Sequence, residues 1–192
     1  MINRTLFSDG VIKFTAIDPE KDAETLSAWS NSPAFLQHYF DGFFHPNMPG
    51  EISKKVKEML KKANENRAQF YFALREVEGN RLVGLVKLGY VVGANQSAWI
   101  VVDLPDAKAF QLYSQPALNL ALDYAFLELS LHKLGVQLPA CSTDEIALYE
   151  AAGFLRESQR RQAVFFEGHY YDELVYGLLR SEWKMRQQEV AG

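Results

Sequence analysis

The side chains best suited to nucleophilic or proton-transfer chemistry are one cysteine, Cys141, and four histidines. A thiolate is a strong nucleophile and an imidazole titrates near neutral pH, so either could act if a second polar group stood beside it. No spacing in the sequence places such a group. His132 and His169 look like parts of the fold pattern, and Cys141 is expected to be a small buried residue.

The sequence contains no motif for a metal site, a serine nucleophile or a Walker-type phosphate loop. The sequence has no His-x-x-x-His pair and no cluster of Cys and His, which are the spacings that zinc requires. It also lacks a GxSxG elbow and a Walker-type glycine loop. The scattered carboxylates are normal for a solvated surface, so we expect no metal site.

Two residue clusters have both a functional and a structural interpretation. The lysines of 51–64 could bind phosphate, but the apolar residues between them recur at helical spacing, which favours a solvated face of an amphipathic helix. An aromatic cluster in the proline-rich stretch 31–49 could line an acceptor pocket, pack in the core or form a dimer contact. Its members are Phe35, Tyr39, Phe40, Phe43 and Phe44.

The composition predicts one globular domain, residues 1–192. At 192 residues and 48% hydrophobic content the chain can bury one sizeable core. Its net charge of -4 argues against a nucleic-acid partner. One cysteine excludes an internal disulfide, and no apolar run approaches membrane-spanning length, so we expect a cytoplasmic protein without a membrane partner.

The apolar patterns predict a mixed α/β protein. Residues 115–129 are apolar on nearly every face, which indicates a buried helix with Pro116 in its first turn, and the strand at 132–138 after it implies a parallel crossover. A polar tail is expected from Ser181. The predicted strands are 11–17, 69–77, 81–92, 98–104, 132–138, one that begins at Phe154, 162–167 and 170–179, and the predicted helices are 22–30, 51–64, 115–129 and 143–152.

Three runs in the second half resemble the GCN5-related N-acetyltransferase (GNAT) superfamily. They are Leu122-Asp123-Tyr124-Ala125-Phe126, Leu131-His132-Lys133-Leu134, and Leu148-Tyr149-Glu150-Ala151-Ala152-Gly153-Phe154. A Leu-x-x-x-Trp ending follows at Leu179 to Trp183. The segments 154–158 and 168–173 are similar to the branch of ribosomal-protein alanine acetyltransferases. The resemblance spans nearly the whole chain and is clearest after Leu118.

The resemblance implies the GNAT fold, with a mixed, mostly antiparallel sheet of about seven strands, a splayed parallel pair and flanking helices. Acetyl-CoA, the implied co-substrate, would lie between the splayed strands, with its pantetheine arm along the main chain of Ile100, Val101 and Val102. Its pyrophosphate would bind a glycine-rich loop at the start of the long helix. Counting back from Tyr124 places that loop at 109–114 and adds these cofactor-binding candidates: Gln111, Leu112, Tyr113, Ser114 and Gln115.

Three positions depart from the family pattern. Both loop glycines and the leading basic residue are missing, although Lys108 and Gln111 could compensate in part. Ser142 replaces an asparagine that usually contacts the cofactor arm; its hydroxyl could bond the arm or could cap the next helix with Glu145. Trp99 stands where the branch often has glutamate.

The implied reaction is acetyl transfer to a primary amine of a small molecule or a peptide N-terminus, by direct attack. In the family the tyrosine that matches Tyr149 protonates the departing CoA sulfur. His38, His45 and Glu51 are candidates for the base, and none is singled out. Family habit implies a homodimer. The departures motivate one alternative, a non-catalytic GNAT-fold ligand-binding or interaction protein with a degenerate cofactor loop.

Overall fold

The computed structural model describes residues 7–30, 35, 46–66 and 68–191. These residues fall into two compact units. The first contains the chain up to Gly89 together with Val101–Tyr124, and the second contains Tyr90–Ile100 and Ala125–Gly192. Each unit is described by itself.

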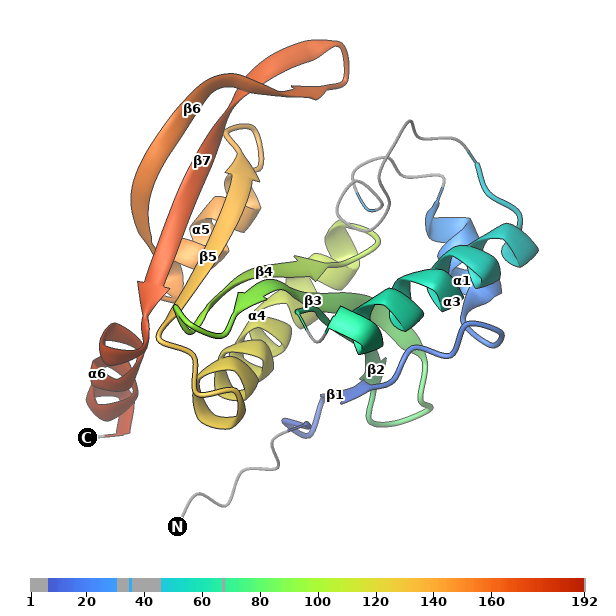
Figure 1. Cartoon of the computed structure of the whole chain (residues 1–192), viewed down its shortest axis with the longest axis horizontal. Helices are drawn as coiled ribbons and strands as arrows, with labels where there is room; N and C mark the ends of the chain where they lie inside the picture. The colour runs from blue at the N-terminus through green and yellow to red at the C-terminus, as the bar shows by residue number, and fades with distance from the viewer. Residues whose placement is uncertain (1–6, 31–34, 36–45, 67, 192) are drawn as a thin grey trace. The chain divides into compact units, whose positions relative to one another are not determined.

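Seven strands form a mixed sheet in the order β1-β2-β3-β4-β5-β7-β6, in which β4 and β5 are parallel. The predicted fold, with its parallel pair in a largely antiparallel sheet, is confirmed (Figure 1). The strands are β1 Ile12–Thr15, β2 Phe70–Glu76, β3 Leu82–Val92, β4 Ser97–Asp103, β5 Lys133–Pro139, β6 Leu155–Phe166 and β7 His169–Leu179.

In the first unit, helices α1 (Ala23–Trp29) and α3 (Pro49–Asn66) bury apolar residues against β2 and β3. Ile52 and Val56 of α3 are 0% and 2% exposed. The lysines of α3 lie mostly toward solvent, where Lys62 pairs with Glu58 one turn away. The prediction of a solvated lysine face on an amphipathic helix is therefore confirmed.

Helix α4 (Ala107–Asp123) begins eight residues before the predicted start at Gln115. Asp106 is its N-cap, because its carboxylate accepts a hydrogen bond from the N–H of Ala109 at 2.8 Å. Pro116 consequently lies inside the helix and not in its first turn, so one backbone hydrogen bond is lost there. A π-helical turn, η1 (Tyr124–Glu128), follows α4.

In the second unit, β7 pairs with β5 from Leu179 opposite Lys133 to Glu173 opposite Pro139. Figure 1 shows β6 and β7 continuing beyond the end of β5 as a two-stranded hairpin. Helix α5 (Thr143–Ala151) connects β5 to β6.

The segment predicted as a polar tail is polar, but it was not expected to be helical, and residues from Arg180 onward form helix α6 (Arg180–Ala191). Trp183 anchors this helix: its side chain is 6% exposed, and its ring lies 5.3 Å from that of Phe126. The prediction for Cys141 is wrong. Cys141 is exposed, because it lies in the turn between β5 and α5.

No helix in the described part of the chain is long and apolar enough to cross a membrane. Across 7–30, 35, 46–66 and 68–191, no group of three His, Cys, Asp or Glu side chains is arranged to hold a metal ion.

Candidate functional site

The parallel strands β4 and β5 pair over only three positions. Ser97, Ala98 and Trp99 lie opposite Lys133, Leu134 and Gly135. Beyond Gly135, residues 136–139 of β5 remain paired with β7 on one edge, and the described residues give them no β4 partner on the other. An open strand edge presents N–H and C=O groups that an extended amide chain can bond. The pairing of β4 with β5 therefore ends partway along the strands, as predicted for a splayed pair.

Ile100, Val101 and Val102 follow the last paired residue of β4, Trp99. The side chain of Ile100 is buried, and those of Val101 and Val102 are half-buried. Their assignment to the pantetheine arm stays a prediction.

Tyr149 lies on α5 and is 3% exposed. Its ring meets that of Phe154 edge-on at 5.1 Å. The helix is fixed to β7 by the neighbouring residue, because the hydroxyl of Tyr176 donates a hydrogen bond to Glu150 at 2.9 Å. Burial, and then this carboxylate, raise the pKa of Tyr176. Tyr149 is thus held on a rigid element, which a positioned proton donor requires.

Ser142 is the N-cap residue of α5 by position, but its side chain makes no capping bond. The capping-box interpretation is therefore wrong. Its backbone ψ of 62° lies outside the extended region that a capping serine usually adopts. Among the described residues the hydroxyl has no hydrogen-bond partner, and its contact with the cofactor arm stays a prediction.

The predicted pyrophosphate loop at 109–114 is wrong as a loop, because all of its residues lie in α4. The cause is the cap at Asp106, which starts the helix before them. Tyr113 and Ser114 are buried, and the amide of Gln115 bonds Asn119. Gln111 and Leu112 are exposed. Whether any of the five contacts a cofactor stays a prediction.

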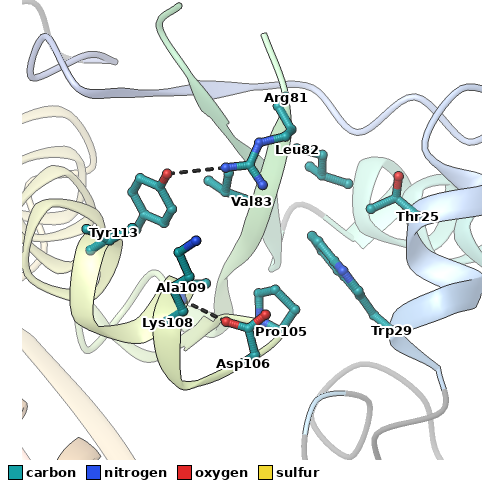
Figure 2. A pocket seen from close by; sticks show the side chains of 11 residues that line it. Thr25, Trp29, Arg81, Leu82, Val83, Pro105, Asp106, Lys108, Ala109 and Tyr113 are labelled. Carbon is teal, nitrogen blue, oxygen red and sulfur yellow. Dashed lines mark hydrogen bonds between the residues drawn. The ribbon is translucent and has the colours of Figure 1, made fainter. Parts of the chain in front are cut away.

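The structure adds a feature that the sequence did not single out, a pocket of about 400 Å³ in the first unit (Figure 2). Arg81, before β3, and Lys108, in the first turn of α4, are its two cations. Lys108 was named from its place beside the missing glycines, whereas nothing in the sequence pointed to Arg81. The other lining residues are Thr25, Trp29, Leu82, Val83, Pro105, Asp106, Ala109, Leu112 and Tyr113.

Most of the predicted acceptor region lies outside the described residues. This includes His38 and His45 among the candidate bases, and Tyr39, Phe40, Phe43 and Phe44 of the aromatic cluster. Phe35 is described and is 3% exposed, which agrees with core packing. Glu51 accepts a hydrogen bond from the N–H of Met48 at 3.1 Å, so it supports the start of α3.

Comparisons with known proteins identify the class of this fold. A family model described as an acetyltransferase (GNAT) domain matches residues 17–175. The chain is 26% identical over 140 residues to the spermidine N(1)-acetyltransferase of Vibrio cholerae serotype O1, covering 73% of this chain and 80% of that protein. It is 28% identical over 130 residues to the probable N-acetyltransferase YjcK of Bacillus subtilis, covering 67% and 71%.

A solved structure supports the same fold. The crystal structure of the Vibrio cholerae spermidine N-acetyltransferase in complex with CoA and spermine matches with a TM-score of 0.76 at 20% identity. The match covers 92% of this chain and 99% of that one. The chain therefore belongs to the GNAT acetyltransferase family. It is an N-acetyltransferase that takes its acetyl group from acetyl-CoA, and the non-catalytic alternative is not favoured.

Proposed function

We propose that this enzyme transfers the acetyl group to a primary amine of a small polyamine-like molecule. The support is the similarity along most of the chain to a protein named as a spermidine acetyltransferase. A formal charge of -4 also favours encounter with a polycation. A peptide N-terminus is the second acceptor class, motivated by the resemblance of 154–158 and 168–173 to the ribosomal-protein alanine branch.

The observation that carries the cofactor part of the proposal is the parting of β4 and β5 after Trp99 and Gly135. The free edge of β5 fits an extended chain of amides such as the pantetheine arm, because each amide can pair as a strand residue does. The capped first turn of α4 fits a pyrophosphate less well, because Asp106 already takes one of its N–H groups. The strand edge is thus the better-supported part of the cofactor site.

Acetyl-CoA supplies a thioester whose carbonyl carbon is open to attack. The neutral amine nitrogen of the acceptor forms a bond to that carbon, and the carbon–sulfur bond breaks as the tetrahedral intermediate collapses. The amine loses one proton to a base or to water, and the departing sulfur gains one. We assign the second proton to the hydroxyl of Tyr149, a general-acid role that a phenol held on α5 suits.

An amine panel tests the acceptor class. Purified protein is incubated with acetyl-CoA and with spermidine, spermine, a monoamine or an alanine-initiated peptide, and products are identified by mass spectrometry. We expect singly acetylated spermidine or spermine at a kcat/KM well above that for the peptide. Acetylation of the peptide alone would replace the polyamine assignment with the second class.

A binding measurement distinguishes a wrong acceptor class from a protein that does not bind acetyl-CoA. Calorimetry with acetyl-CoA and with CoA should show binding even if none of the panel amines is the acceptor. Absence of binding at millimolar concentration would overturn the proposed cofactor site.

A cytoplasmic location and a homodimer belong to the same proposal. The exposed single thiol of Cys141 fits a reducing compartment.

A further inference from the structure

Helix α5 ends in a tight turn that fixes the place of Tyr149. The N–H of Phe154 donates a hydrogen bond to the carbonyl of Tyr149 at 3.0 Å. The N–H of Gly153 donates to the carbonyl of Glu150 at the same distance. With Gly153 at a φ of 99°, this pair of bonds is a Schellman ending, and the contact between the rings of Phe154 and Tyr149 is the apolar contact that accompanies it. The turn therefore sets where the side chain of Tyr149 lies.

A side chain from the C-terminal helix bonds this turn from outside α5. The Nη2 of Arg186, in α6, donates to the carbonyl of Ala151, the last residue of α5, at 2.7 Å. The last carbonyls of a helix lack partners within the helix, and a cation beside them also offsets the negative end of the helix dipole. Arg186 lies close against the turn, because a Cβ added to Gly153 would come within 2.6 Å of its Cδ. A glycine at 153 thus provides both the positive φ and the room for the arginine.

Helix α6 is held in place by contacts that do not involve Arg186. The helix lies beyond residue 175, where the match to the family model ends. The N–H of Leu179 donates to the carboxylate of Glu182 at 2.8 Å, which supports the first turn of α6. The buried Trp183 packs on Phe126, and Arg186 follows three residues later on the same side of the helix. Loss of the guanidinium should therefore leave α6 in place and break its bond to α5.

We propose that Arg186 is a positioning residue for acetyl transfer, a role that rests on the proposed function of Tyr149 as the general acid. By holding the end of α5, Arg186 keeps the hydroxyl of Tyr149 within reach of the departing sulfur. Proton transfer requires hydrogen-bond distance, and a displacement of about 1 Å can cost up to about 10²-fold in rate. Arg186 is exposed, and it would act through the backbone of α5 and not by contact with a substrate.

Hydrogen exchange measures the stability of the turn without any acceptor. In Arg186→Ala, the amides of 149–154 should exchange about three- to tenfold faster than in wild type, because the bonds of the turn open more often. Arg186→Lys should restore part of the protection, since an ammonium can still donate to the carbonyl of Ala151. Lys184→Ala removes a charge from an exposed position of the same helix and should change nothing. Equal exchange in Arg186→Ala and wild type would overturn the proposal.

Steady-state kinetics with the amine that the panel identifies measure the effect on catalysis. Arg186→Ala should lower kcat about tenfold and leave the KM for the amine and the affinity for CoA within about twofold, because neither substrate is contacted. Arg186→Lys should recover most of the loss, whereas Lys184→Ala should keep the kcat of wild type. Thermal unfolding checks that each variant is folded.

A double-mutant cycle separates positioning from a general structural role. On a Tyr149→Phe background, Arg186→Ala should cost no more than about twofold further in kcat, because the hydroxyl that it positions is already absent. An undiminished loss on that background would show that Arg186 acts on something other than Tyr149, which contradicts the proposal. Full kcat in Tyr149→Phe alone would remove the general acid and the positioning role together. Wild-type kcat in Arg186→Ala, beside a large loss in Tyr149→Phe, would remove the positioning role only.

Discussion

The ring of Trp99 lies directly over Gly135 at the last paired step of β4 and β5. A Cβ added to Gly135 would come within 2.8 Å of Cζ3 and 2.9 Å of Cε3 of that ring. A side chain at position 135 is therefore excluded by the indole, at the point where the pairing ends.

Gly135→Ala should destabilise the protein by about 1–3 kcal/mol, because the rigid, half-buried ring of Trp99 must shift to admit the methyl group. Thermal and urea unfolding measure the loss. Its control is the same change on a Trp99→Leu background, where the ring is gone. The cost there should be at least about 1 kcal/mol smaller, and equal costs would show that Trp99 is not what excludes the methyl group.

Tyr149→Phe should lower kcat by about 10²- to 10⁴-fold, because the departing sulfur loses its proton donor. The affinity for CoA should remain within a few-fold, since the ring and its contact with Phe154 are kept. Steady-state kinetics by product detection and calorimetry provide the two measurements.

The matched control for that variant is Tyr170→Phe, which removes the hydroxyl group of a tyrosine that is 66% exposed in the β6–β7 hairpin. It should leave kcat unchanged. Full activity of Tyr149→Phe would remove the general-acid assignment, and an equal loss in both variants would point to a structural effect.

The ion pair of Asp22 and Arg75 should be essential to the first unit. The arginine Nη2 lies 2.7 Å from each carboxylate oxygen, and the two side chains are 4% and 12% exposed. Asp22→Ala leaves a largely buried guanidinium bonded only to Thr15 and the Asn80 carbonyl, without a carboxylate, so the unfolding free energy should fall by up to about 3 kcal/mol. Chemical denaturation measures the change.

The comparison variant is Glu58→Ala, which breaks an ion pair whose side chains are both 67% exposed. Solvent screens that pair, so little change is expected. A small effect of Asp22→Ala would mean that water reaches Arg75 in the folded protein.

Glu145 should make stability depend on pH. Burial, and then the nearby Asp144, raise the pKa of Glu145 above its ordinary value of 4.5. Holding this carboxylate charged at neutral pH therefore lowers the free energy of unfolding. This cost is relieved as pH falls through the raised pKa, and it is absent once both folded and unfolded chains are protonated.

Glu145→Gln should accordingly unfold at a higher temperature than wild type at pH 7, with the difference shrinking as the pH approaches 4.5. Thermal unfolding across this range is the measurement. A difference that grows toward low pH would contradict the direction of the pKa shift.

The sequence predicted those elements whose apolar pattern is local. The β2–β3 hairpin and the amphipathic helix α3 fall close to their predicted bounds, because alternation and helical spacing are visible within a few residues. The start of α4 was missed because Pro116 suggested a first turn, whereas the Asp106 cap decides it. Helix α6 was missed because its composition is polar and because its buried Trp183 packs on Phe126, a residue far away in the chain.

The residues of the candidate site also fall into those that a local motif indicates and those that only the fold brings together. Tyr149 and Ser142 were proposed because they lie in or beside a contiguous motif, and their roles stay predictions. Arg81 could not be found, because it joins Lys108 only after β3 and α4 have folded, and no spacing in the sequence reports that proximity. Sequence motifs locate what one element carries, and pockets built from several elements require the fold.

The outer strand β6 ends the sheet, and nearly all its residues from Leu155 to Ala163 are exposed. Its open edge is rich in arginine, with Arg156, Arg160 and Arg161, and its pairing with β7 shifts register twice. Charge and irregular register both oppose the docking of a foreign strand. Both features make this edge a poor template for strand addition by a second copy of the chain.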